Sequence, residues 1–310
     1  MKLYFSLILC FLLSIVISCD NKQQSEKIKI SGAFALYPMV VRWAEEFKVL
    51  HPNVNFDISC SGAGKGMTDV LTGLVDIGMV SREISKEEIK NGAFSIASVR
   101  DAVVPVVNVD NPNLKDIVSI GLKKEVAKRL WNGKFRTWGS VLKTSNKTPV
   151  HVFTRSDACG AAETWAAWFG STQEDLKATA IFGDPGIANA VQKDKLGVGY
   201  SNISYVYSLK TRKPYTGLVI FPLDLNGNGK IDKEENFYDT LESLVAAISD
   251  GRYPSPPARN LYLVTKKKPI NPILIIFLKY VLSEGQRYVA KTGYISLGKK
   301  KLCQELAKLN

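Results

Sequence analysis

Histidine and cysteine are scarce in this chain, which has two histidines and five cysteines among its 310 residues. Cys10 and Cys19 fall in the first twenty residues, so Cys60, Cys159 and Cys303 remain for the body of the chain. An odd number of cysteines cannot pair completely, so no full disulfide framework is expected. Cys60 and Cys159 each lie beside a small-residue turn, and a disulfide between these two stays open.

The shortage of histidine argues against catalysis by a cysteine nucleophile. Cys159 follows a predicted strand at a helix N-terminus, where a thiolate could be activated. His151 lies on that strand roughly 13 Å from Arg155, which is too far for a comfortable cysteine–histidine pair. His51 lies at the end of another predicted helix. We therefore expect a protein that is not an enzyme and keep a Cys159-dependent enzyme as an alternative.

No hydrophobic run is long enough for a comfortable membrane span. The apolar run over 3–17 follows Lys2 and has the length and flanks of a signal peptide. It ends in Val-Ile-Ser-Cys at 16–19, which resembles a bacterial lipobox, where the cysteine becomes the lipid-modified N-terminus. We expect a signal peptide over 1–18, lipidation at Cys19, a polar tether over 19–27 and a location on the extracytoplasmic face of the cell envelope. The alternative is a secretory signal with an incidental cysteine.

Acidic residues are outnumbered, with 29 aspartates and glutamates against 41 lysines and arginines, and the formal net charge is +12. On an exported chain this excess does not indicate nucleic acid. It suits an anionic ligand or an anionic membrane surface, and it is also compatible with a solvated surface because the lysines are scattered.

A small-residue loop over 61–66 leads into an apolar pattern typical of a short helix. Glycines let a backbone approach a ligand closely, and the N-terminus of a helix favours an anion. The loop is not a nucleotide-binding Walker A motif, because Lys65 is followed by Gly66 rather than by serine or threonine.

The same order of strand, turn and helix occurs three times. The predicted strands cover 27–31, 54–59 and 150–154, and their turns cover 32–37, 61–66 and 155–160. This order is typical of a parallel sheet with crossover helices, in which ligands bind beyond the carboxyl ends of the strands. The third turn carries Arg155, whose planar fork suits oxyanions, and Asp157, which could orient it.

The length of the chain suggests two lobes. An apolar β-branched strand predicted over 102–109 is a candidate to cross into a second lobe, and a strand over 259–265 could return. We expect a first lobe made of 28–104 plus 259–310 and a second lobe made of 105–258.

From about residue 28 to about 298 the chain resembles the phosphate-binding component of ABC phosphate importers. The motifs that carry this resemblance are Gly-Ala-Phe-Ala-Leu-Tyr-Pro at 32–38, Ser-Gly-Ala-Gly at 61–64, Val-Asp-Ile-Gly-Met-Val-Ser-Arg at 75–82, Arg-Ser-Asp-Ala-Cys-Gly at 155–160, Gly-Val-Gly-Tyr at 197–200 and Thr-Gly-Tyr-Ile-Ser-Leu at 292–297. The resemblance implies an α/β, two-lobed type II periplasmic binding protein fold. Each lobe would be a mixed, mostly parallel sheet flanked by helices, with the ligand cleft between the lobes.

The resemblance also implies an oxyanion site drawn from four segments. Its candidate residues are Ala35, Leu36 and Tyr37, Ser61, Ser81 and Arg82, and Arg155, Asp157, Cys159, Gly160 and Ala161. The family has hydroxyls in the first and last of these segments, which Ala35, Leu36, Cys159 and Ala161 lack. Ser81 stands where the family often has an aspartate that accepts the proton of a protonated phosphate, so discrimination by protonation weakens. Arg82 is either a second cation or a salt-bridged surface arginine.

Residues 224–235 match the twelve-residue calcium loop of the EF-hand. The expected ligands are the side chains of Asp224, Asn226, Asn228, Asp232 and Glu235 and the carbonyl group of Lys230. The loop occurs once, so we expect a structural calcium ion that fixes an insertion in the second lobe, away from the transported ligand. The alternative is a hairpin turn rich in asparagine and glycine.

Together these features predict a solute-binding lipoprotein that captures an inorganic oxyanion, most simply phosphate, when its lobes close. The expected partners are the membrane subunits of an ABC importer and, through the lipid, the membrane, but not nucleic acid, and we expect a monomer. The alternatives are another oxyanion or a small carboxylate as ligand, and a calcium-stabilised surface lipoprotein.

Overall fold

The computed structural model describes residues 26–310. The predicted signal peptide, the lipidation site Cys19 and most of the predicted tether lie outside the described residues. Strand β1 begins at Glu26, so the last two residues of the predicted tether belong to the sheet instead. Within residues 26–310, no helix combines the length and the apolarity needed to cross a bilayer.

The first lobe is built on three strands that pair in parallel around β1. They are β1 (Glu26–Gly32), β2 (Val54–Cys60) and β3 (Ile77–Val80). The helices of this lobe are η1 (Phe34–Leu36), α2 (Tyr37–Leu50), α3 (Ala63–Thr72), α4 (Lys86–Lys90), α12 (Pro272–Leu282), η3 (Glu284–Tyr288), η4 (Ala290–Thr292) and α13 (Lys299–Ala307). Apolar residues on α2 and α12, among them Trp43, Phe47 and Phe277, are fully buried against the sheet and form one hydrophobic core.

The second lobe has its own core. Its strands are β5 (His151–Arg155), β6 (Thr179–Ile181), β7 (Gly197–Asn202) and β8 (Leu218–Ile220). Its helices are α5 (Leu114–Ile120), α6 (Lys124–Trp131), α7 (Trp138–Leu142), α8 (Gly160–Trp168), η2 (Gln173–Asp175), α9 (Gly183–Lys193), α10 (Ile203–Val206) and α11 (Leu241–Asp250). Trp131, Trp165 and Tyr200 pack together in this core, with ring centroids 5.0–6.1 Å apart; Trp165 stacks on Tyr200, and Trp131 meets Trp165 edge to face.

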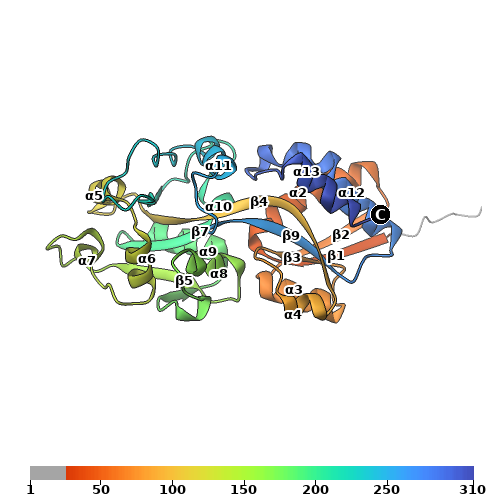
Figure 1. The fold of residues 1–310 in the computed structure, drawn as a ribbon, viewed down its shortest axis with the longest axis horizontal. Helices are drawn as coiled ribbons and strands as arrows, with labels where there is room; N and C mark the ends of the chain where they lie inside the picture. The colour runs from red at the N-terminus through yellow and green to blue at the C-terminus, as the bar shows by residue number, and fades with distance from the viewer. Residues whose placement is uncertain (1–25) are drawn as a thin grey trace, which may run out of the picture.

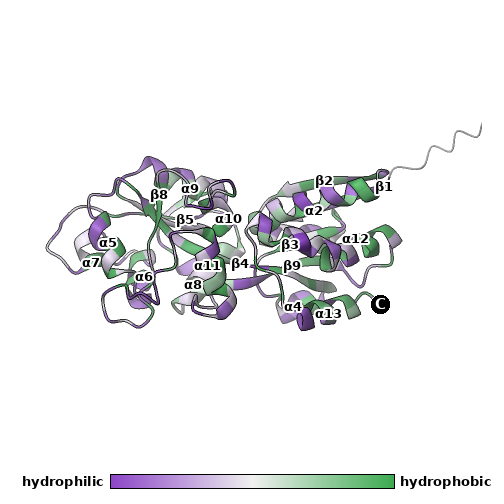
Figure 2. Cartoon of the chain, turned by 90° about the horizontal axis from the view of Figure 1, so that it is seen from above, coloured by the Kyte–Doolittle hydropathy of each residue, from purple (hydrophilic) through white to green (hydrophobic). Residues whose placement is uncertain are grey.

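Two long strands run from one lobe into the other, as Figures 1 and 2 show from two directions. They are β4 (Ala93–Asn108) and β9 (Ala258–Lys266), which pair antiparallel with a bulge between Ala97 and Val99. The sheet therefore continues through both lobes in the order β2-β1-β3-β9-β4-β7-β5-β6, with β8 paired to β4. Parallel pairs within each lobe and antiparallel pairs at the crossing confirm the predicted two-lobed α/β fold.

Candidate functional site

Three helix N-termini lie where the two lobes meet. η1 with α2, α3 and α8 each begin just after the carboxyl end of a strand, namely β1, β2 and β5. The two lobes are in contact here, because the Gly64 N–H at the start of α3 donates to the Ala158 carbonyl just before α8, at 3.2 Å. Gly62 has a φ of +86°, and a Cβ there would lie 2.7 Å from Oδ2 of Asp157. Glycine is thus required both by the backbone and by the close approach of the second lobe.

A second close approach joins α8 to the end of β3. A Cβ on Gly160 would lie 2.1 Å from the carbonyl oxygen of Ser81 and 2.5 Å from its hydroxyl. Ser81 is itself buried. The predicted site residues Ser81 and Gly160 therefore meet across the lobe boundary, with no room for a side chain at position 160.

Several hydrogen-bond donors at this boundary are available to a ligand. The hydroxyl of Ser61 is buried and has no hydrogen-bond partner. The first N–H groups of a helix have no partner within it. At α8 the Cys159 N–H donates to Oε1 of Gln173, at 3.2 Å, and the Ala162 N–H donates to Sγ of Cys159, at 3.4 Å. The N–H groups of Gly160 and Ala161, between them, are the ones that α8 can offer to an anion.

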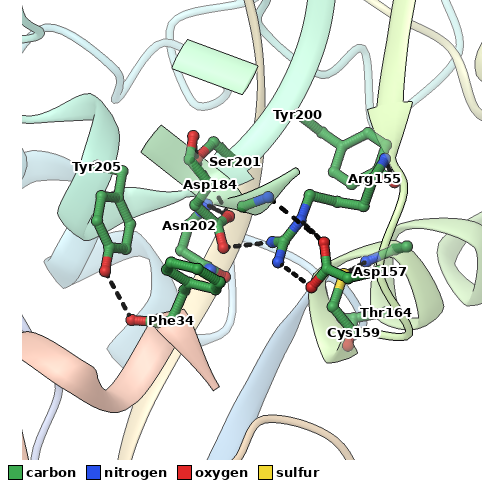
Figure 3. A network of polar contacts seen from close by, with 12 residues as sticks. Phe34, Arg155, Asp157, Cys159, Thr164, Asp184, Tyr200, Ser201, Asn202 and Tyr205 are labelled. Atoms are coloured by element: carbon green, nitrogen blue, oxygen red, sulfur yellow. Dashed lines mark hydrogen bonds and ion pairs between the residues drawn. The ribbon is translucent and has the colours of Figure 1, made fainter. Parts of the chain in front are cut away.

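Arg155 ends β5, and its guanidinium is held on three sides (Figure 3). Nε and Nη2 donate to the two carboxylate oxygens of Asp157, at 2.8 and 2.5 Å, and Nη1 donates to Asp184. The ring of Phe34, from the first lobe, lies over the guanidinium with its centroid 5.3 Å away. The arginine side chain is 1% exposed. Burial disfavours its charge, but the carboxylates of Asp184 and Asp157 outweigh burial and raise the pKa of Arg155.

Asp184 and Phe34 belong to this arrangement, although neither is among the site residues predicted from the sequence. Asp184 lies in the first turn of α9 and is 1% exposed. Its Oδ1 accepts the Asn202 N–H at 3.0 Å and the Ser201 hydroxyl at 3.2 Å, while Oδ2 accepts from Arg155. An acidic residue at a helix start is common, so the sequence held no signal that sets Asp184 apart.

The first turn reaches the boundary mainly through Phe34. Ala35 and Leu36 are buried, and the Leu36 and Tyr37 N–H groups donate within the turn, to Ala33 and Phe34. Tyr205 of the second lobe donates its hydroxyl to the Phe34 carbonyl at 2.9 Å (Figure 3). Of the predicted site residues Ala35, Leu36 and Tyr37, the last two therefore have backbone N–H groups that already donate within the turn and are not available to a ligand.

Arg82 is engaged in ion pairs rather than free. Its guanidinium donates to both carboxylate oxygens of Glu88, at 2.9 and 2.6 Å, and lies 3.2 Å from Glu163 on α8. Glu88 belongs to the first lobe and Glu163 to the second, so Arg82 links the lobes. Of the two sequence-based interpretations, the structure matches the salt-bridged arginine.

The thiol of Cys159 is poorly suited to nucleophilic chemistry. It is buried, and burial raises the pKa of Cys159 to about 12. His151 lies at the opposite end of β5 and faces Asp194, with Nδ1 2.6 Å from its carboxylate. Cys60, Cys159 and Cys303 are all free thiols, so the disulfide that the sequence left open is not formed.

Thiol labelling should separate these cysteines. At pH 8 we expect iodoacetamide to modify the exposed Cys303 on the order of a hundredfold faster than Cys159, because a buried thiol with a raised pKa supplies almost no thiolate. Peptide mapping by mass spectrometry measures each rate, and labelling in denaturant is the control. Rapid modification of Cys159 in the folded protein would contradict this description of the site.

The loop over 224–235 is closed by its own acidic residues. Asp224 is buried, and its carboxylate oxygens accept the N–H groups of Gly227 and Gly229, at 2.7 and 2.8 Å. Glu235 is also buried, and its Oε1 accepts the Leu225 N–H at 2.8 Å.

Lysines also contact the acidic groups of this loop. Lys123 lies 3.6 Å from Oδ2 of Asp224, and Lys230 lies 2.9 Å from Oδ1 of Asp232. Lys230, together with the amides of Asn226 and Asn228, lowers the pKa of Asp232 to about 2. In residues 26–310, no three His, Cys, Asp or Glu side chains are gathered closely enough to hold a metal ion.

Two lobes, two crossing strands and helix N-termini that meet at the lobe boundary define a two-lobed α/β binding protein. The model of a family described as "PBP superfamily domain" matches residues 20–285, and the chain belongs to this family.

Curated relatives carry the name phosphate-binding protein PstS. The protein from Staphylococcus haemolyticus is 26% identical over 298 residues, covering 93% of this chain and 86% of the relative. The protein from Pseudomonas aeruginosa PAO1 is 28% identical over 295 residues, covering 86% and 81%. These relatives confirm the resemblance to the phosphate-binding component of ABC phosphate importers.

Solved structures share the fold. A phosphate ABC transporter substrate-binding protein from Clostridium perfringens, determined with bound phosphate, superposes with a TM-score of 0.71 at 23% identity, covering 88% of this chain and 100% of that one. An ABC-type phosphate transport receptor from Vibrio cholerae superposes with a TM-score of 0.64 at 18% identity, covering 87% and 100%.

Proposed function

We propose that this protein captures inorganic phosphate outside the cytoplasmic membrane and delivers it to an ABC importer. The observation that carries the proposal is the buried hydroxyl of Ser61, which has no partner and lies beside the N-terminus of α3 at the lobe boundary. An unpaired buried hydroxyl costs free energy unless a ligand satisfies it. The relatives named PstS and their coverage of the chain support phosphate as that ligand.

The site would hold the anion chiefly through neutral donors. Ser61 offers a hydroxyl, and Gly160 and Ala161 offer N–H groups at the start of α8. Arg155 keeps only part of its fork for a ligand because Asp157 and Asp184 occupy the rest. One arginine between two carboxylates leaves a net negative charge, so aligned N–H dipoles would supply most of the attraction.

Capture and release need no covalent step. The contacts of Gly64 with Ala158 and of Arg82 with Glu163 exist only while the lobes are together. We infer that ligand binding stabilises this closed arrangement, which presents one surface to the importer. The family to which the chain belongs binds solutes, and we propose binding without catalysis.

Calorimetric titration of the delipidated protein tests the function. Phosphate should release or absorb heat at one site per chain, and Ser61→Ala should weaken binding about tenfold through loss of one hydrogen bond to a charged group. Sulfate, arsenate, molybdate, tungstate and small carboxylates are the competing ligands. If another of these binds while phosphate gives no heat, the ligand assignment is wrong.

We also propose that Cys19 carries a lipid that anchors the monomeric protein at the cell envelope. The support is the lipobox-like sequence over 16–19. Mass spectrometry of the mature protein from membranes should find an N-terminal Cys19 with a lipid adduct. Cys19→Ser should leave the protein out of the membrane fraction, whereas retention there would contradict the anchor.

We propose further that a structural calcium ion binds at 224–235, supported by the spacing of its oxygen-bearing residues. The carboxylates of Asp224, Asp232 and Glu235 are not gathered around one point in the structure, so the ion would have to draw them from their present N–H and lysine partners before they supply hard oxygens. Calcium at a hundred times its dissociation constant should then raise the free energy of unfolding by about 2.7 kcal/mol, which differential scanning calorimetry detects as a shift of several degrees.

Two variants sharpen the calcium test. Glu235→Gln should abolish the thermal shift, and Lys123→Gln should enlarge it, because the Lys123 ammonium lies beside Asp224 and competes with a cation. If the parent protein melts at the same temperature in calcium and in chelator, the proposed calcium site is wrong.

A further inference from the structure

We propose that Arg259 is a positioning residue of the phosphate site and reaches it only through other residues. This inference rests on the proposed function. Arg259 lies on the crossing strand β9, outside all four segments that the sequence analysis assigned to the ligand. Its guanidinium joins the crossing strands to two elements that build the site.

The first partner of Arg259 lies on the other crossing strand. Asp101 on β4 is its cross-strand neighbour, and Nε of Arg259 donates to Oδ1 of Asp101 at 2.9 Å. Asp101 is fully buried and Arg259 is 7% exposed. Burial raises the pKa of Asp101, and the arginine opposes that rise. The ion pair therefore places two opposite, buried charges side by side on the strands that connect the lobes.

The other partners of Arg259 lie in the second lobe. Nη1 donates to the Thr164 hydroxyl on α8 at 3.1 Å, and Nη2 donates to the side-chain oxygen of Asn202 at the end of β7. α8 is the helix whose first N–H groups face the boundary. Arg259 thus contacts the body of the helix that presents those donors.

Asn202 carries the connection on to the site arginine. Its backbone N–H donates to Oδ1 of Asp184 at 3.0 Å, and Oδ2 of Asp184 accepts from Nη1 of Arg155. The buried polar chain therefore runs from Asp101 through Arg259, Asn202 and Asp184 to Arg155; Asn202, Asp184 and Arg155 are labelled in Figure 3. Each link is a hydrogen bond between groups that are at least nine-tenths buried.

Position 259 requires the planar guanidinium group of arginine, because three partners in different directions are hydrogen-bonded at once. One guanidinium donates in three directions, to Asp101, Thr164 and Asn202, whereas a lysine ammonium would place a point charge there without fixing the three angles. Losing the fork would free Asn202 and, with it, the backbone N–H that orients Asp184. We therefore expect the position of Arg155, and so the affinity for phosphate, to depend on Arg259.

Calorimetry with phosphate tests this dependence on three variants. Arg259→Gln should weaken binding at least tenfold and Arg259→Lys about threefold to tenfold. Asn202→Ala, which leaves the pair of Arg259 and Asp101 intact, should weaken binding about threefold or more. Hydrogen–deuterium exchange should be faster at the Ser201–Asn202 amides in all three, with or without ligand.

The matched control is Glu305→Gln in the first lobe. Glu305 is also fully buried and holds two lysines, at 2.9 and 2.6 Å, so its loss removes a buried charge that makes no hydrogen bond to Asp101, Arg259, Asn202, Asp184 or Arg155. It should lower the melting temperature and leave phosphate affinity within twofold of the parent. An equal loss of affinity in Glu305→Gln would show that general destabilisation, rather than positioning, explains the Arg259 effect.

A double-mutant cycle with Asp184→Asn gives the decisive outcome. If the series of buried hydrogen bonds connects Arg259 to Asp184, adding Arg259→Gln to Asp184→Asn should lower the affinity for phosphate by less than a further threefold. If the losses of affinity in Arg259→Gln and Asp184→Asn multiply fully in the double mutant, the proposal is wrong. It is also wrong if the single variants Arg259→Lys and Asn202→Ala both bind phosphate as tightly as the parent. Neither result would argue against phosphate binding itself. A parent protein that binds no phosphate would instead overturn the proposed function, and the exchange rates at 201–202 would still report whether Arg259 holds Asn202.

Discussion

Arg155→Ala is expected to lower the affinity for phosphate at least a hundredfold. The variant removes the arginine that Asp157 and Asp184 hold at the lobe boundary, and it leaves both carboxylates without their partner. Breaking a buried ion pair costs about 3–5 kcal/mol, so the free energy of unfolding should fall as well. Calorimetry measures the first effect and urea unfolding the second.

Two further variants separate charge from geometry. Arg155→Lys keeps the positive charge but loses the fork, and we expect at least a tenfold loss of affinity. Arg252→Ala is the matched control, because Arg252 forms an exposed ion pair with Asp250, and solvent-exposed pairs contribute little to stability. Phosphate affinity within threefold of the parent in Arg155→Ala would remove Arg155 from the site.

Gly160→Ala is the second substitution with a large expected effect. The added methyl group would lie 2.1 Å from the Ser81 carbonyl oxygen, which is backbone and cannot turn aside. The two lobes would have to stay apart at this point, so the donors of α8 and the hydroxyl of Ser61 could not contact one ligand together. We expect phosphate affinity to fall a hundredfold or more, with little change in the stability of either lobe.

The control for Gly160→Ala is Gly298→Ala. Gly298 precedes α13, and a Cβ there would meet no atom within 4 Å. Small-angle X-ray scattering with phosphate should show compaction in the parent and in Gly298→Ala and a more extended Gly160→Ala protein. Compaction and tight binding in Gly160→Ala would mean that the closed arrangement does not involve this contact.

Local order in the chain was predictable because it depends on short-range signals. Each turn that follows β1, β2 and β5 combines small residues with an apolar pattern of helical spacing. Helix α8 begins within one residue of its predicted start, but α3 begins at Ala63, inside the loop predicted over 61–66, because small residues such as Ala63 and Gly64 also fit the first turn of a helix. The pairing of Arg155 with Asp157 was also within reach, since the two residues are neighbours in the chain.

Long-range pairings could not be predicted in this way. Asp184 joins the site because β7 brings Asn202 beside it, and Arg259 joins it because β9 pairs with β4, which carries Asp101. Arg82 likewise meets Glu163 only when the lobes come together. Nothing near these residues in sequence distinguishes them from other charged residues. The crossing strand β4 was predicted only over its apolar half, because polar residues such as Arg100 and Asp101 interrupt the pattern.

A crystal structure with arsenate tests the central claim most directly. Arsenate has the shape and charge of phosphate, and arsenic can be located by its anomalous scattering. We predict one arsenic peak at the lobe boundary, with arsenate oxygens within hydrogen-bond distance of the Ser61 hydroxyl and the Gly160 and Ala161 N–H groups. An arsenic peak elsewhere on the molecule, or closed lobes with no arsenic between them at saturating arsenate, would contradict it.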